Sequence, residues 1–125
     1  MIFPIMNMTR EKLEQLIEEA AHNGEPLSME GEDLSWADLS GCDFTDANLR
    51  GASLVRANLG GADLSGADMR ETDLRNADLE GAVLRDALLN DADVAGASFR
   101  EADLVGADIE GVNFDEAIIE DARFL

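Results

Sequence analysis

Cysteine, aromatic residues and positive charge are all scarce in this chain. Its 125 residues include one cysteine, one tryptophan, five phenylalanines and no tyrosine. A single cysteine excludes an internal disulfide, so we expect a reducing compartment, with the cytoplasm as the default location. Nine basic residues stand against 28 acidic ones, which gives a formal net charge of −19. Because such a charge repels phosphate, we expect no direct nucleic-acid binding and no membrane partner, whereas basic protein surfaces fit.

Long apolar runs are also missing. No stretch is apolar enough for long enough to predict a transmembrane helix. Residues 1–8 form a short apolar arm without a positive leading segment or a small-residue cleavage site, so no signal peptide is predicted. Apolar residues still make up 46% of the chain. Most of them are Ala and Leu, which indicates a thin, regular interior rather than a broad core.

Residues 9–23 are expected to form a short helix. Thr9 suits the N-cap position, and Glu11 complements the helix dipole in the first turn. Gly24 suits the left-handed residue that follows a helix, and Pro26 prevents continuation. One face carries apolar residues at the helical spacing, and this stripe consists of Leu13, Leu16, Ile17 and Ala20. Since a helix of this length is marginal alone, its stripe must cover another part of the molecule.

From residue 32 onward the sequence repeats every five residues. Every fifth residue from Leu34 to Phe124 is large and apolar, nineteen in all. Two positions before it stands a small residue, Ala in fifteen of the nineteen repeats, and the residue between them is usually Asp. We therefore divide the chain into an N-terminal arm and capping helix (1–31) and a repeat domain (32–125).

A period of five fits neither regular element. Five residues advance an α-helix by about 140°, and an odd step on a strand reverses the face, so both would scatter the apolar residues. The chain must instead turn once per repeat, and four repeats would close one coil whose large residues point to a common axis. The expected core residues are Leu39, Phe44, Leu49, Leu54, Leu59, Leu64, Met69, Leu74, Leu79, Leu84 and Leu104. Gly is frequent two positions after each large residue, where it permits positive φ, and a different turn type is expected where Asp, Glu or Arg replaces it.

Residues 37–41 and 62–66 both read Ala-Asp-Leu-Ser-Gly and match the A(D/N)LxX unit of pentapeptide-repeat proteins. The chain resembles that family throughout residues 32–125. The resemblance implies an all-β fold, a right-handed quadrilateral parallel β-helix (a solenoid) of about 4–5 coils, often with a short helix capping its N-terminal end. It also implies a bacterial protein. Most members have no known biochemical activity, and the best-understood ones mimic DNA and bind gyrase.

Residues that could support catalysis are few and poorly placed. His22 is the only histidine and is expected near the helix C-terminus. Cys42 stands at an Ala position, where it should be buried and unreactive. No catalytic triad, phosphate loop or zinc spacing is present, so we predict no enzyme, no catalytic residue and no cofactor. Acids such as Asp43 and Asp63 recur in columns where two carboxylates could share a cation. Outward acids that bond the backbone or water are the alternative, and we predict no metal site.

The two ends of the repeat domain differ. Leu13, Leu16 and Ile17, with Trp36 alongside, are expected to cover the N-terminal end. The chain stops at Phe124 and Leu125 without a polar cap, and these two residues form a candidate interface for a C-terminal homodimer. On the side of the rod, Leu88 and Leu89 suggest an exposed apolar spot, whose alternative is a scattered surface residue.

The sequence therefore predicts a non-enzymatic interaction scaffold for an unidentified protein partner. The alternative is a DNA mimic that binds and modulates DNA gyrase, a type II topoisomerase. A narrow acidic rod favours the alternative, while the short rod and the eight arginines that interrupt the acidic surface count against it.

Overall fold

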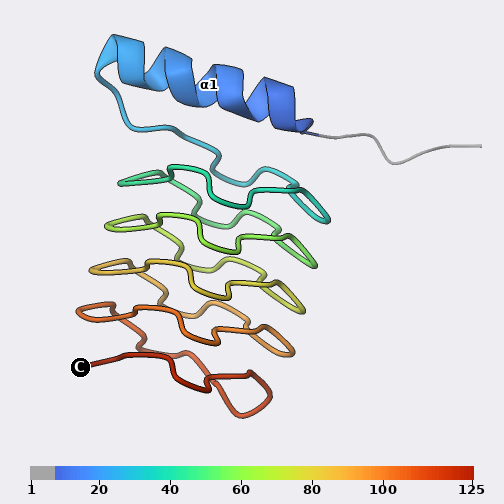
Figure 1. Cartoon of the computed structure of the whole chain (residues 1–125), viewed down its shortest axis with the longest axis vertical. Coiled ribbons are helices and arrows are strands. Elements are labelled where there is room, and N and C mark those ends of the chain that lie inside the picture. Colours follow the sequence, from blue (N-terminus) through green and yellow to red (C-terminus); the bar gives the residue numbers. More distant parts are fainter. Residues whose placement is uncertain (1–7) are drawn as a thin grey trace, which may run out of the picture.

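The computed structural model describes residues 8–125, so the apolar arm expected at residues 1–8 lies almost entirely outside the described part. One helix, α1 (Arg10–Asn23), is followed by a rod of stacked coils, and the C-terminus lies at the end of the rod away from α1 (Figure 1). Within residues 8–125 the coils pair only through isolated parallel bridges, with no longer strand. The chain turns after every bridge, which prevents any strand from lengthening.

Helix α1 begins and ends at capping residues. The Thr9 hydroxyl accepts a hydrogen bond from the Lys12 N–H at 3.1 Å. Gly24 adopts φ 69°, the left-handed conformation that closes a helix without a Cβ clash. Leu13 is fully buried, and Leu16 and Ile17 are half-buried against the core. The helix therefore lies across the N-terminal end of the rod (Figure 1). It is the single helix of the described part and is neither long nor apolar enough to cross a membrane.

The bridges join residues that are twenty positions apart, which equals four repeats. A representative pair of hydrogen bonds runs from the Leu59 N–H to the Asp78 carbonyl at 2.7 Å and from the Asn58 N–H to the Ala37 carbonyl at 2.9 Å. Bridging starts at Ser28, before the expected start of the repeat domain at residue 32. Met29, at 2% exposure, is consequently the first large residue of the core.

The core is a set of stacked columns along the axis of the rod. All eleven residues expected there are at most 1% exposed. The small residues of most repeats are buried as well, for example Ala62 and Ala82 at 0%. Around the axis, columns of large residues, mostly Leu, alternate with columns of small residues, mostly Ala. The inward corner at each small position has no room for a large side chain. Truncating a buried Leu of this kind costs about 2–5 kcal/mol, so these columns hold the coils together.

Repeats end in a tight turn whose third residue is left-handed, except the turn from Phe114 to Ala117, where Glu116 is the third residue. The Ala62 N–H bonds the Leu59 carbonyl at 3.0 Å, and Gly61 between them has φ 65°. Nine residues other than Gly share this conformation, with φ between 58° and 65°, and they are Trp36, Asp46, Arg56, Glu71, Asn76, Asp86, Asp91, Glu101 and Asp121. The expectation of a different turn type is therefore wrong at these nine positions, whereas Glu116, which also replaces Gly, does depart from the left-handed conformation. Hydrogen bonds from the coils on either side fix the turn, so the side chain must accept the conformation and point outward.

The last coil departs from this regularity. The Gly96 N–H bonds the Glu116 carbonyl, one residue beyond the partner that the twenty-residue register gives elsewhere. Phe114 occupies a column that holds Leu or Val in the preceding coils. Its ring packs edge-to-face on Phe99 and on Phe124, with 5.6 Å between centroids in both pairs. We attribute this one-residue shift in the last coil to the larger side chain of Phe114.

Candidate functional site

The Asp of each repeat holds the turn that follows it. Asp63 shows the pattern, because its Oδ1 accepts a hydrogen bond from the Ser65 N–H at 3.0 Å. All ten Asp residues at this position do the same, and Asn48, Asn58 and Asn113 substitute for Asp in three further repeats. These side chains therefore act as local turn acceptors. The acidity of the rod follows in part from the way its backbone turns.

Two of these carboxylates also bind an arginine side chain through both oxygens. Arg70 donates to both carboxylate oxygens of Asp68 at 2.8 and 2.7 Å, and Arg75 binds Asp73 with the same two distances. The arginine hydrogen bond, helped by the backbone N–H, lowers the pKa of Asp68 and of Asp73 below the ordinary value. Arg50, which stacks in a column with Arg70, pairs instead with Glu71 at 2.8 Å. The arginines thus neutralise neighbouring acids.

The stacked acids that could share a cation already accept hydrogen bonds from the backbone. Asp43 and Asp63 are bridge partners, as are Asp73 and Asp93. In each of the four, Oδ1 already accepts a backbone N–H. Residues 8–125 contain no group of three or more His, Cys, Asp or Glu side chains that could hold a metal ion.

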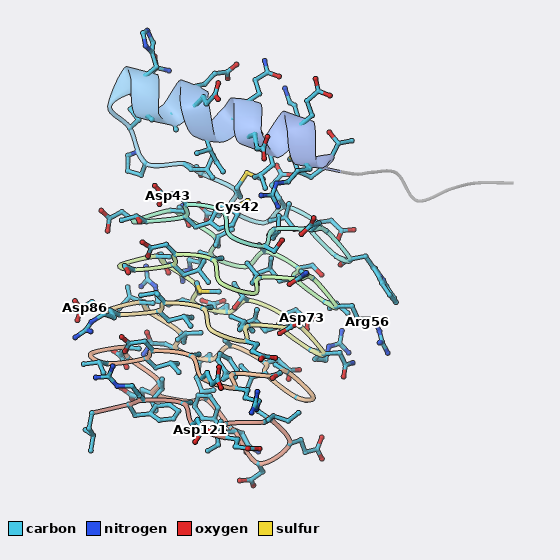
Figure 2. The ribbon with its side chains drawn as sticks, viewed as in Figure 1. Cys42, Asp43, Arg56, Asp73, Asp86 and Asp121 are labelled. Atoms are coloured by element: carbon cyan, nitrogen blue, oxygen red, sulfur yellow. The ribbon has the colours of Figure 1, made fainter. Side chains whose placement is uncertain are left out.

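Cys42 lies beneath α1, as Figure 2 shows. It is 5% exposed, and burial raises the pKa of its thiol. A hollow of about 240 Å³ separates α1 from the first coil, and Arg10 and Glu14 line it together with Cys42. A buried thiol with a raised pKa is a poor nucleophile, so this hollow has no reactive group. His22 lies in the last turn of α1 and is exposed.

Trp36 does not cover the N-terminal end. It stands at a left-handed turn position, φ 65°, and is 72% exposed. The guanidinium carbon of Arg56 lies 5.1 Å from the centre of its ring. The expectation for Trp36 is therefore wrong, because a side chain at this turn position points away from the axis. The repeat register contained this information, since Trp36 falls two positions after Leu34.

The C-terminal end exposes part of the core. Phe124 is half-buried and Leu125 fully exposed, while Ile118 and Ile119 are 51% and 44% exposed. No further coil of residues 8–125 covers them. On the side of the rod, Leu88 is half-buried and Leu89 buried, so the pair forms no exposed apolar spot.

Three comparisons place the chain among known proteins. Residues 33–70, 67–104 and 82–121 match the family model for pentapeptide repeats. The crystal structure of alr5209, a pentapeptide repeat protein from Nostoc PCC 7120, is 30% identical with a TM-score of 0.72, over 90% of this chain and 95% of that one. No protein of curated function is significantly similar in sequence.

Two further solved structures are similar over shorter or less superposable regions. HetL, a pentapeptide repeat protein involved in heterocyst differentiation regulation in Nostoc sp. strain PCC 7120, is 27% identical with a TM-score of 0.33, over 79% of this chain and 62% of that one. A trypsin-treated QnrB1, a plasmid-mediated fluoroquinolone resistance protein, is 21% identical with a TM-score of 0.40, over 76% of this chain and 64% of that one.

Proposed function

Because this chain belongs to the pentapeptide-repeat family, whose fold is a right-handed β-helix, we propose that it is a rigid, non-enzymatic scaffold that binds another protein. The observation that carries the proposal is the use of the repeat's own acids. All ten Asp residues of the repeat accept a hydrogen bond from the turn beside them, so their main task is to hold the rod in shape. A protein partner therefore meets a rigid surface of regularly spaced side chains.

The proposed architecture has about 4–5 coils capped by α1, and each coil contacts only its neighbours. A rod of this kind changes little on binding, so a partner meets pre-organised side chains and loses little affinity to ordering. The net charge of −19 steers it toward partners with basic surfaces in the cytoplasm.

The scaffold proposal is tested by affinity capture with the immobilised full chain. We expect a specific protein to bind, and we expect added free chain to displace it from the immobilised chain. A chain whose surface acids outside the Asp turn position are changed to amides serves as the control, because its fold stays and its charge falls. Capture of no protein above background, or equal capture by the control of every bound protein, contradicts the proposal.

We also propose that two copies associate through the open C-terminal end, at Phe124 and Leu125. An unpaired coil edge and a half-covered core at one end both favour a second copy of the same surface. Sedimentation tests this association, and its dependence on salt is argued in the Discussion.

Modulation of DNA gyrase by DNA mimicry is a second candidate, favoured by the charge of −19 on a narrow rod. Against it, arginines divide the acidic surface, for example Arg50, Arg70 and Arg100, each paired with a carboxylate. A supercoiling assay with purified gyrase distinguishes the two functions. Inhibition or protection of gyrase at stoichiometric protein supports mimicry, and an unchanged reaction at large excess removes it.

A further inference from the structure

One corner of the rod differs from the other three in charge. It is formed by the stacked turn residues 35–36, 55–56, 75–76 and 95–96, which we call the corner ridge. Their stacking is visible in the hydrogen bonds from the Trp36 N–H to the Val55 carbonyl at 2.9 Å and from the Arg56 N–H to the Arg75 carbonyl at 3.0 Å. Over these four coils the ridge has two arginines and no carboxylate, in a molecule with 28 acids. Its column acquires acids only in the last coil, at Asp115 and Glu116, and the Glu116 carbonyl accepts the Gly96 N–H. The turn columns at the other three corners contain acids within the same four coils.

The arginine at the centre of the ridge has free donors. Six of the eight arginines lie within 4.0 Å of a carboxylate. Within residues 8–125 Arg56 has no such partner and makes no side-chain hydrogen bond. It projects from the corner of the rod on the side away from Asp86, as Figure 2 shows. Its guanidinium carbon lies over the Trp36 ring, and its N–H groups remain available to an anion.

Trp36 adds an apolar surface at the same place. It is the largest side chain of the molecule, is 72% exposed and is held at φ 65°. A bulky residue in this conformation is strained, and Gly fills the equivalent position in many repeats without that strain. Exposed tryptophan beside arginine is also the pair of residue types most enriched where protein partners bind.

We propose that Trp36 and Arg56 form the docking site for a partner protein, and that the docked segment presents a carboxylate beside an apolar side chain. The carboxylate accepts two parallel hydrogen bonds from the Arg56 guanidinium, and the apolar side chain covers the free part of the indole ring. The inference rests on the proposed scaffold function and specifies the chemistry of its partner.

The docked segment of the partner needs only one carboxylate at the contact, so the rest of the partner's surface can be basic. The acidic faces on either side of the ridge attract such a partner over distance, while Arg56 selects its one carboxylate at contact. A uniformly acidic partner is repelled by the rest of the rod.

Site-specific photo-cross-linking in cells of the source organism tests the site. A photoreactive residue replaces Val55, which lies on the ridge between Trp36 and Arg56, or Thr45, an exposed turn residue of another corner. We expect the Val55 probe to capture a protein, at a segment with Asp or Glu next to an apolar residue. Arg56→Glu should lower that yield at least tenfold, while Arg85→Glu, the same charge change at the opposite corner, should leave it unchanged.

The possible outcomes separate the site from the function. Cross-links from Thr45 alone overturn the docking site and leave the scaffold standing, whereas no cross-link from either position contradicts both. Capture by Val55 of a second copy of the chain, of nucleic acid or lipid, or of a segment without a carboxylate overturns the proposed chemistry.

A synthetic peptide of the captured segment then gives a direct measurement. Trp36 is the only tryptophan, so its selectively excited fluorescence reports this site alone. Binding should shift the emission, and Arg56→Glu should weaken binding at least tenfold. Trp36→Gly, measured by calorimetry, should abolish binding without lowering the unfolding midpoint, because Gly tolerates φ 65°. Unchanged peptide affinity in both variants overturns the proposal.

Discussion

At the scale of single residues, most turns of the rod are held by two devices. In the repeat around Leu64, the Asp63 carboxylate accepts the Ser65 N–H, and Gly66 then takes the left-handed conformation that lets the Ala67 N–H reach back to the Leu64 carbonyl. The first device needs an oxygen acceptor, and the second needs a residue that tolerates positive φ. The composition of the chain, rich in Asp and Gly, follows from these two requirements.

Adjacent glycines in one turn give a matched test of the second device. Gly61 has φ 65° and open space around its missing Cβ, so Gly61→Ala should destabilise the protein by about 1–2 kcal/mol through backbone strain alone. Gly60 has an ordinary φ, and its Cβ would meet the Asn58 Oδ1 at 3.1 Å and the Glu80 carbonyl oxygen at an ordinary contact distance of 3.7 Å. Gly60→Ala should stay within about 0.5 kcal/mol of the parent. Urea unfolding measures both, and equal effects would show that φ is not what selects Gly here.

Acid sensitivity follows from the carboxylates that hold arginines. The pKa of Asp68 is lowered in the folded state by its hydrogen bond from Arg70. A lowered folded-state pKa means that the folded protein binds the proton less readily than the unfolded chain does. The resulting stability is fully present above the unfolded value of about 3.9 and is lost as the pH falls through the folded value.

We therefore expect Asp68→Asn to flatten the acid limb of stability against pH. The amide can still accept the Arg70 N–H, as Asn48 accepts that of Arg50 in the stacked repeat, so the turn remains. Unfolding by urea between neutral pH and pH 3 is the measurement, and Asp108→Asn, whose carboxylate lies in no ion pair within residues 8–125, is the control. An acid limb equally steep in Asp68→Asn and in the parent would contradict the assignment.

At the scale of the coil, left-handed acids and amides lie over glycines of the next coil. Asp46, Asn76, Asp86 and Asp91 each place Oδ1 where a Cβ would stand on the residue twenty positions later, and those residues are Gly66, Gly96, Gly106 and Gly111. Turn positions in neighbouring coils are therefore coupled. A short polar side chain folded over the ladder requires Gly beneath it.

This coupling predicts non-additive substitutions. Gly66→Ala should cost more than Gly61→Ala, because it strains φ and also displaces the Asp46 carboxylate. Asp46→Gly should have little effect alone and should recover the second part of that cost in the double variant. A double-mutant cycle by urea unfolding should give a coupling of about 0.5–1 kcal/mol. Additive single effects would show that Asp46 moves aside freely.

The Ala-Asp-Leu-Ser-Gly units predicted the family by resemblance, and the repeat spacing predicted the core columns. A step of five can bury Leu34, Leu54 and Leu74 together only if the chain turns in every repeat, and this holds for any residue at the turn. Side-chain propensity misled for the turns themselves, where Asp86 and Arg56 adopt the same conformation as Gly. Propensity is a local preference, whereas hydrogen bonds from two neighbouring coils fix these turns.

The candidate site was less predictable. Trp36 is attractive as a cover for an open end because it is large and apolar, yet its register position directs it to solvent. Its contact with Arg56 joins residues twenty positions apart and follows only from the stacking of the coils. We attribute the one-residue shift in the last coil to the size of Phe114. A pattern of large and small residues does not distinguish Phe from Leu.

At the scale of the whole molecule, the C-terminal end combines an apolar centre with an acidic rim. The last twenty residues, 106–125, contain six acids and one arginine, Arg123. Phe124 and the exposed Ile119 lie among them. Two such ends attract through apolar contact and repel through charge, so ionic strength should control the proposed homodimer.

We expect sedimentation velocity to show mainly monomer at low salt and increasing dimer as salt rises toward 0.5 M. Leu125→Asp should abolish the dimer at every salt concentration, and Thr45→Asp, on the side of the rod, should not. A dimer that weakens as salt increases would point to ion pairs across the contact, and monomer alone at high protein and salt concentration would contradict the association.

Because bridges join residues twenty positions apart, four five-residue repeats complete one coil. The number of repeats therefore sets the rotation of one end of the rod relative to the other. One added repeat would keep every leucine on the axis and yet carry the C-terminal end a quarter of the way around it relative to α1. Four added repeats would lengthen the rod and restore the original orientation. The number of repeats therefore fixes how the helix, the corner with Trp36 and the open end are oriented relative to one another. The gain or loss of one repeat would change that orientation without disturbing the core.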